Sequence, residues 1–140
     1  MYLIFAFSYD IIVSERCDTV KEDKLGNLSM ELSVEILKLT KELHLKHESV
    51  ISNQIGRSAT SICANIAESK YAHGRADFIA KLEISLKETN ETSKWLEMLW
   101  KSTYIDEQTY KALDRKCSTI RFLLVKSVTT AKNNLNNRKE

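Results

Sequence analysis

Residues 51–68, ISNQIGRSATSICANIAE, form three separate lines of side chains when the segment is placed on a helix. The first line is apolar and recurs at helical spacing: Ile51, Ile55, Ile62 and Ile66. The second holds small residues, which allow another helix backbone to approach closely: Gly56, Thr60, Cys63 and Ala67. The third line is polar: Gln54, Ser61, Asn65 and Glu68. A surface of this kind specifies helix packing, so it constrains the fold more than the chemistry.

The rest of the chain also favours helices. It has no proline and only three glycines in 140 residues, so nearly all helix breakers are missing. At this length, with 43% hydrophobic residues, we expect a single domain with a hydrophobic core. The predicted fold class is all-α.

Apolar periodicity predicts four helices. The first covers about residues 29–46, with Ser29 or Asn27 as its cap, and the second about 48–72. The third follows the turn 74–77, and its predicted inward face is Phe78, Leu82, Leu86, Thr89, Ser93, Leu96 and Trp100. The fourth follows a cap at Asp106, and its inward face is Leu113, Cys117, Ile120, Leu124, Val128, Ala131 and Leu135.

Four long helices with short joins predict an antiparallel up-and-down four-helix bundle over residues 25–135. Residues 1–24 are interpreted as an N-terminal extension and 136–140 as a polar tail, with fraying expected after Lys132. The apolar start, Met1–Val13, is interrupted by Asp10, lacks a basic residue and is shorter than a membrane span of about 20 residues. We therefore expect no signal peptide and no membrane association; a docked or flexible extension and a start codon assigned too early both remain open.

The three cysteines, Cys17, Cys63 and Cys117, match no metal or redox spacing, which indicates reduced thiols and a cytoplasmic protein. No motif for a catalytic nucleophile or a phosphate loop is present, so no enzyme and no cofactor are expected. The carboxylates on the third helix lack the Glu-x-x-His motif of di-metal bundles. We therefore predict a structural polar network in place of a metal site, made of Gln54, Ser61, Asn65, Glu68, Glu88 and Glu91.

Several bulky apolar side chains fall outside the predicted core faces. They are Ile84, Trp95 and Met98 on the third helix, and Phe122 and Val125 on the fourth. Aligned apolar residues away from the core are commonly covered by a partner surface, so these five are predicted to form an interface in a homo-oligomer.

Positive charge is concentrated near the C terminus. Between Tyr110 and Lys139 there are eight basic residues and one acidic residue, a net charge of +7. Such a helix can bind a phosphate backbone, and the candidate nucleic-acid contacts are Lys111, Arg115, Lys116, Arg121, Lys126 and Lys132. The alternative is an ordinary solvated helix whose cations complement the helix dipole.

The segment Ser52–Glu68, SNQIGRSATSICANIAE, resembles a signature of the 23S rRNA intervening-sequence proteins, SxQ(L/I)xRSxxSIxANIxE. Further matches follow in order on the third helix: Asp77–Lys81, Lys87-Glu88, Glu91-Thr92 and Trp95-Leu96. The resemblance covers about residues 27–132. The chain departs from the pattern at Gly74, where relatives often have a serine cap, and residues 1–24 have no counterpart in it.

The resemblance implies a bacterial four-helix bundle without enzymatic activity that assembles into a ring-like homo-oligomer, a pentamer. Members are encoded within insertions of the large-subunit rRNA gene or elsewhere. They are similar in fold to accessory proteins of diversity-generating retroelements, which bind nucleic acid and a reverse transcriptase. Two hypotheses follow for this chain: an oligomer that binds RNA through its basic fourth helix, and a scaffold that binds a protein through Trp95, Met98 and Phe122.

Overall fold

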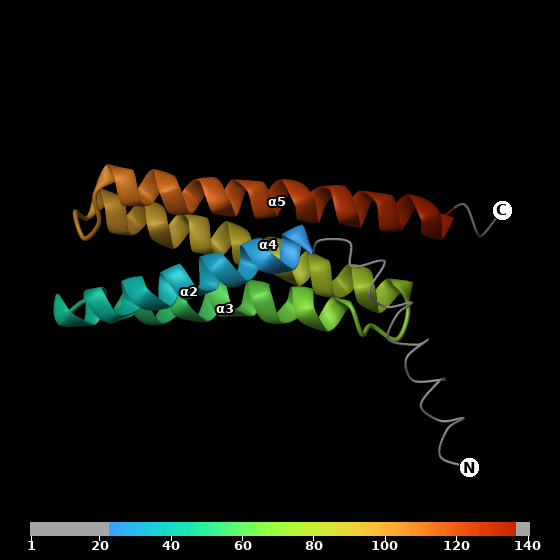
Figure 1. Cartoon of the computed structure of the whole chain (residues 1–140), viewed down its shortest axis with the longest axis horizontal. Helices are drawn as coiled ribbons and strands as arrows, with labels where there is room; N and C mark the ends of the chain where they lie inside the picture. Colours follow the sequence, from blue (N-terminus) through green and yellow to red (C-terminus); the bar gives the residue numbers. More distant parts are fainter. Residues whose placement is uncertain (1–22, 137–140) are drawn as a thin grey trace, which may run out of the picture.

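The computed structural model describes residues 23–136, which form four α-helices joined by short turns (Figure 1). These are α2 (Lys24–Leu45), α3 (Val50–Ser69), α4 (Arg75–Lys101) and α5 (Glu107–Asn136). Figure 1 shows that consecutive helices run in alternating directions. The predicted all-α, up-and-down bundle is confirmed for this part of the chain.

The four helices occupy the corners of the bundle in chain order. α2 and α4 each pack against both α3 and α5, and the described residues show no contact between α2 and α4, so these two lie at opposite corners. Figure 1 shows that α2 begins part-way along the bundle, whereas α5 continues past this point. Among the described residues, α2 therefore does not extend along the C-terminal end of α5.

The core is lined by leucine and isoleucine from all four helices. On α5 the predicted inward face is confirmed, because all its members are buried except Leu135, which packs against the core from its edge. On α4 the prediction is only partly correct. Leu82, Thr89 and Leu96 are buried as predicted, but Phe78, Leu86, Ser93 and Trp100 are only half-buried. Four residues of α4 outside the predicted face are buried instead: Ile79, Ser85, Thr92 and Leu99.

Buried hydroxyls mark the places where helices approach closely. Ser33 Oγ donates to the carbonyl of Ala59 across α2 and α3 at 2.8 Å, and Ser58 Oγ lies 2.8 Å from Thr92 Oγ1 across α3 and α4.

The prediction that one line of small residues on α3 lies against another helix is correct only in part. Gly56 does lie beside α2, but Thr60 and Ala67 of that line are exposed.

Carboxylates cap three helix starts. Asp106 caps α5 as predicted, since its Oδ1 accepts the Thr109 N–H at 2.7 Å. The predicted start of the first helix is wrong: α2 begins at Lys24, and Asp23 accepts the Gly26 N–H at 3.1 Å. A Cβ at Gly26 would lie 2.0 Å from the Asp23 carboxylate, so the glycine makes room for this cap. At α3, the buried Glu48 accepts the N–H of residues 51 and 52.

Two sequence predictions concern segments beyond this description. The extension 1–24 lies outside the described residues except for 23 and 24, and the tail 136–140 lies outside them except for residue 136. α5 continues to Asn136, beyond Lys132, where the polar sequence predicts fraying. Within the described part of the chain, no helix has the length and hydropathy needed to cross a bilayer.

Candidate functional site

The basic side chains predicted to bind nucleic acid all lie on α5, but they differ in their surroundings. Lys111, Arg115, Lys126 and Lys132 are exposed, whereas Lys116 and Arg121 are partly buried. The three predicted to point directly outward, Lys111, Arg115 and Lys126, do so. All six therefore lie on one helix, but they differ in how far their side chains are exposed to solvent.

Four of the six have partners within the protein. Lys116 binds Glu35 at 2.8 Å and Glu31 at 3.3 Å on α2, and hydrogen bonding to Glu35 raises the pKa of its ammonium group. The other three partners are Glu107 for Lys111, Glu83 for Lys132 and, through a hydrogen bond of 2.6 Å, Asn90 for Arg121. Lys116 is thus a bridge that joins α5 to α2, and it is not a free contact residue.

Arg115 and Lys126 are the two members whose side chains make neither an ion pair nor a hydrogen bond among residues 23–136. Both side chains are exposed. An exposed cation that is not already paired can bind a phosphate without breaking an internal contact, so these two residues form the centre of the candidate nucleic-acid surface.

The predicted polar network is two separate ion-pair clusters across α3 and α4. In the first, Arg57 binds Glu88 at 3.3 Å and also pairs with Glu91, which accepts a hydrogen bond from the Trp95 indole at 3.3 Å. Burial alone would raise the pKa of Glu91, but the hydrogen bonds from Arg57 and Trp95 outweigh it and lower that pKa. The same carboxylates raise the pKa of Arg57.

In the second cluster, Glu68 pairs with Lys81 of α4. Asn65 bonds instead to Ser61 on its own helix, with its Nδ2 2.9 Å from the Ser61 carbonyl. Gln54 is exposed and makes no side-chain hydrogen bond within residues 23–136, so its assignment to the network is wrong. Helical spacing placed Gln54, Ser61, Asn65 and Glu68 on one line of α3. The carboxylates of α4 instead pair with Arg57, which was not among the predicted network residues.

Four of the five predicted interface residues are exposed: Ile84, Met98, Phe122 and Val125. Phe122 is 67% exposed, the largest value among them. Trp95 differs, because it is half-buried against the core and bonded to Glu91. This places Trp95 within the structure of the single chain.

A second apolar line was missed by the sequence analysis. Met30, Val34 and Leu37 of α2 recur at helical spacing and are all exposed. In the sequence they neighbour the core positions of the same helix, so periodicity alone gives a broad apolar face. Only the placement of the other helices shows that this line points outward.

Comparison with known proteins identifies the family. A family model described as 23S rRNA-intervening sequence protein matches residues 9–126. The chain belongs to this family. The match confirms the resemblance derived from the motifs. It begins at residue 9, so it extends further toward the N terminus than those motifs indicated.

A solved structure agrees with this membership. The chain is similar to a crystal structure of a protein of unknown function from the S23 ribosomal protein family of Bacteroides thetaiotaomicron, at 44% sequence identity and a TM-score of 0.73. The alignment covers 74% of this chain and 97% of that chain. No curated protein is significantly similar to the chain.

Two further groups of side chains concern metal binding and thiol chemistry. Residues 23–136 contain no group of three histidine, cysteine or carboxylate side chains placed to bind a metal ion. Cys63 and Cys117 are free thiols, and burial raises the pKa of Cys117 to about 12. A thiol with this pKa stays protonated at neutral pH and is a poor nucleophile.

Proposed function

We propose that this member of the 23S rRNA-intervening sequence protein family is a non-enzymatic homo-oligomer that binds RNA through a basic surface centred on α5. The observation that carries the proposal is the pair of exposed cations, Arg115 and Lys126, that have no ion-pair partner in the described chain. The family description, which names the 23S rRNA, supports RNA as the polyanion.

Two apolar surfaces support self-association. One is the line Met30, Val34 and Leu37 on α2; the other is made of Ile84, Met98, Phe122 and Val125 on α4 and α5. Because α2 and α4 lie at opposite corners, one chain can present a different surface to each of two neighbours. Head-to-tail contacts of this kind close into a ring when the rotation between neighbours divides a full turn evenly. We propose a pentameric ring, in keeping with the family resemblance.

Light scattering tests the assembly directly. Wild-type protein is expected to have the mass of several chains, and Val34→Glu with Leu37→Glu to lower it by placing charge in one interface. Val50→Glu is the control, since Val50 is exposed but lies on α3 outside both surfaces. A wild-type mass equal to one chain would show that the proposed ring is wrong.

RNA binding is tested by a double charge reversal, Arg115→Glu with Lys126→Glu. The matched control is Lys24→Glu with Lys38→Glu, which changes the net charge equally at two exposed positions of α2. Fluorescence anisotropy with a labelled RNA hairpin should show binding that weakens steeply with salt, is abolished in the first variant and is kept in the control. Equal RNA affinity in wild type and the first variant would refute the proposed surface.

A protein-binding scaffold is the second candidate. It is favoured by the 67% exposure of Phe122, a large aromatic ring that the described chain leaves uncovered. In this case a pull-down should recover one defined protein after nuclease treatment, and Phe122→Ser should release it. Loss of every bound protein on nuclease treatment would contradict the scaffold.

A further inference from the structure

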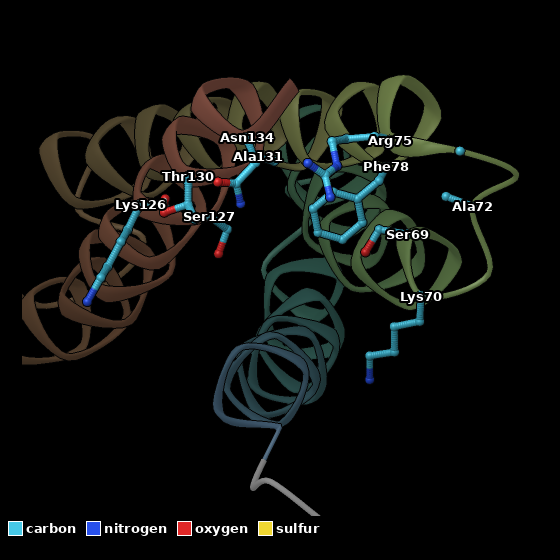
Figure 2. A pocket seen from close by; sticks show the side chains of 11 residues that line it. Ser69, Lys70, Ala72, Arg75, Phe78, Lys126, Ser127, Thr130, Ala131 and Asn134 are labelled. Carbon is cyan, nitrogen blue, oxygen red and sulfur yellow. Dashed lines mark hydrogen bonds between the residues drawn. The ribbon is translucent and has the colours of Figure 1, made fainter. Parts of the chain in front are cut away.

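Within residues 23–136, a cleft of about 680 Å³ lies at the end of the bundle that α2 does not reach. Its walls are the end of α3, the 70–75 turn, the start of α4 and the last turns of α5, and α2 contributes no lining residue (Figure 2). The volume is within the range of roughly 300–1,000 Å³ that is typical of ligand pockets. As formed by the described residues, the cleft is therefore large enough for a small ligand.

The lining of this cleft is positively charged. It includes Lys70, Arg75 and Lys126 and no carboxylate. A second cleft, of about 420 Å³, is lined by Glu35, Glu42 and Asp106 against one lysine, Lys38. Positive lining is thus a property of the first cleft and is not shared by every hollow on this bundle.

Arg75 is the most informative residue in the cleft. It is the first residue of α4, where the helix dipole disfavours a positive side chain. Its Nη1 is buried and has no hydrogen-bond partner within residues 23–136. Leaving a buried charged donor unpaired is costly, and an anion in the cleft would satisfy it. The sequence carries a signal for this residue, an arginine in a helical first turn, which the sequence analysis did not use.

The backbone beside Arg75 leaves space for an anion. Gly74 precedes α4 without a side-chain cap, and a Cβ at Gly74 would have no atom within 4 Å. The first N–H groups of a helix are good anion donors when no side chain covers them. The helix start thus offers backbone donors near the guanidinium, while the first-turn carboxylate of Asp77 accepts the His73 N–H at 3.1 Å.

The opposite wall adds polar groups and the floor adds an aromatic ring. Ser127, Asn134 and Lys126 come from α5, and none of the three makes an ion pair or side-chain hydrogen bond among the described residues. Phe78 packs partly against the core and lies in the cleft, and Figure 2 shows the Arg75 guanidinium turned toward this ring. Lys70 is at the rim, where it pairs with Asp23.

We propose that this cleft binds one nucleotide of the RNA, with its phosphate held by Arg75 and Lys126 and its base against Phe78. The inference rests on the proposed function and adds a specific site to it. A phosphate satisfies the unpaired guanidinium, an aromatic face accepts any base by stacking, and Ser127 and Asn134 supply donors to the sugar or base.

Mononucleotide binding tests the cleft apart from the rest of the surface. The full-length chain is titrated with uridine 5′-monophosphate, with uridine and with inorganic phosphate by isothermal titration calorimetry. The monophosphate should bind more tightly than uridine, and Arg75→Gln should weaken it about tenfold. Lys41→Gln is the control, because Lys41 is an exposed cation of α2 outside the cleft. Unchanged monophosphate affinity in Arg75→Gln would overturn the site.

An RNA arm separates charge from stacking. With an oligouridylate of roughly eight nucleotides, Arg75→Gln should lower the affinity about tenfold and reduce the salt slope by about one unit. Phe78→Leu should lower the affinity and leave the salt slope unchanged, because it removes a ring and no charge. Circular dichroism of both variants should show the helical content of the wild type, as a control for folding.

The outcomes distinguish the site from the function. RNA binding that both cleft variants leave intact would refute the cleft and keep the proposed function. Tight binding of the monophosphate that Arg75→Gln removes, without any binding of RNA, would support the cleft as a nucleotide site and refute the proposed function.

Discussion

The ion-pair cluster around Arg57 gives the sharpest prediction about stability. Arg57 of α3 binds Glu88 at 3.3 Å and pairs with Glu91, so one guanidinium ties α3 to two turns of α4. Glu88 is buried, and its second oxygen has no partner among the described residues. Arg57→Met keeps most of the side-chain volume and removes the charge, which leaves a buried carboxylate without its cation.

The expected loss follows from burial. Hydrogen bonds to a charged group contribute about 1.5–3 kcal/mol when they are shielded from water. Half of the Arg57 side chain is exposed, at 51%, so water screens part of this contribution. We therefore expect Arg57→Met to lower the free energy of unfolding by about 1–2 kcal/mol.

Urea unfolding at fixed protein concentration measures this loss. With a denaturant slope of about 2 kcal/mol/M, the unfolding midpoint should fall by roughly 0.5–1 M. Arg115→Met is the matched control and should change stability by less than about 0.5 kcal/mol, since Arg115 is exposed and has no ion pair in the described chain. In a Glu88→Gln background, Arg57→Met should cost less than it does in the wild type.

The pH dependence provides the refutation. The pKa of Glu91 is lowered in the folded protein, so its contribution to stability is complete above its ordinary pKa of 4.5 and is lost as the pH falls through the lowered value. The difference between wild type and Arg57→Met should therefore shrink in acid. A difference that stays constant from pH 7 to pH 3, or that is below about 0.5 kcal/mol at pH 7, would refute the reasoning.

Three other predictions concern single residues. Thr103, a β-branched residue at φ 64°, should gain about 1 kcal/mol of stability on replacement by glycine, seen as a higher melting temperature; no gain would show that its backbone is not strained. NMR titration should find the pKa of Glu97 at about 2, and Lys101→Gln should raise it; an ordinary pKa in the wild type would contradict the observed pairing. In native protein at pH 8, a thiol reagent should modify the partly exposed Cys63 and spare the buried Cys117, because burial raises the pKa of Cys117 to about 12. Peptide mapping would identify the modified residue, and equal modification of both would contradict the burial of Cys117.

Features carried by a local repeat were predictable. The seven positions from Leu113 to Leu135 are spaced by three or four residues, and all of them face the core. The Asp106 cap is equally local, because its carboxylate bonds to a backbone N–H three residues later. Interactions of this range depend on one helix only, so the order of residues is enough to define them.

Features that depend on a second helix were not predictable in the same way. Ser85 and Thr92 of α4 are small polar residues that suit a surface as well as a core, and it is the approach of α3 that buries them. Lys116 is one of eight basic residues in its segment, and only the position of α2 shows that it is already paired. In the first case the sequence is compatible with a buried or an exposed hydroxyl, and in the second with a paired or an unpaired lysine.

The sequence by itself determined the class of the fold, the number of helices, the core face of α5 and the family. Each of these follows from helical periodicity or from motifs read along the chain. Only the tertiary structure decided which cations are unpaired among the described residues, which apolar line faces outward, and that Arg75 and Lys126 line the same cleft. The physical reason is that charge pairing and burial depend on neighbours distant in sequence, and the relative lengths of the packed helices determine which neighbours are present.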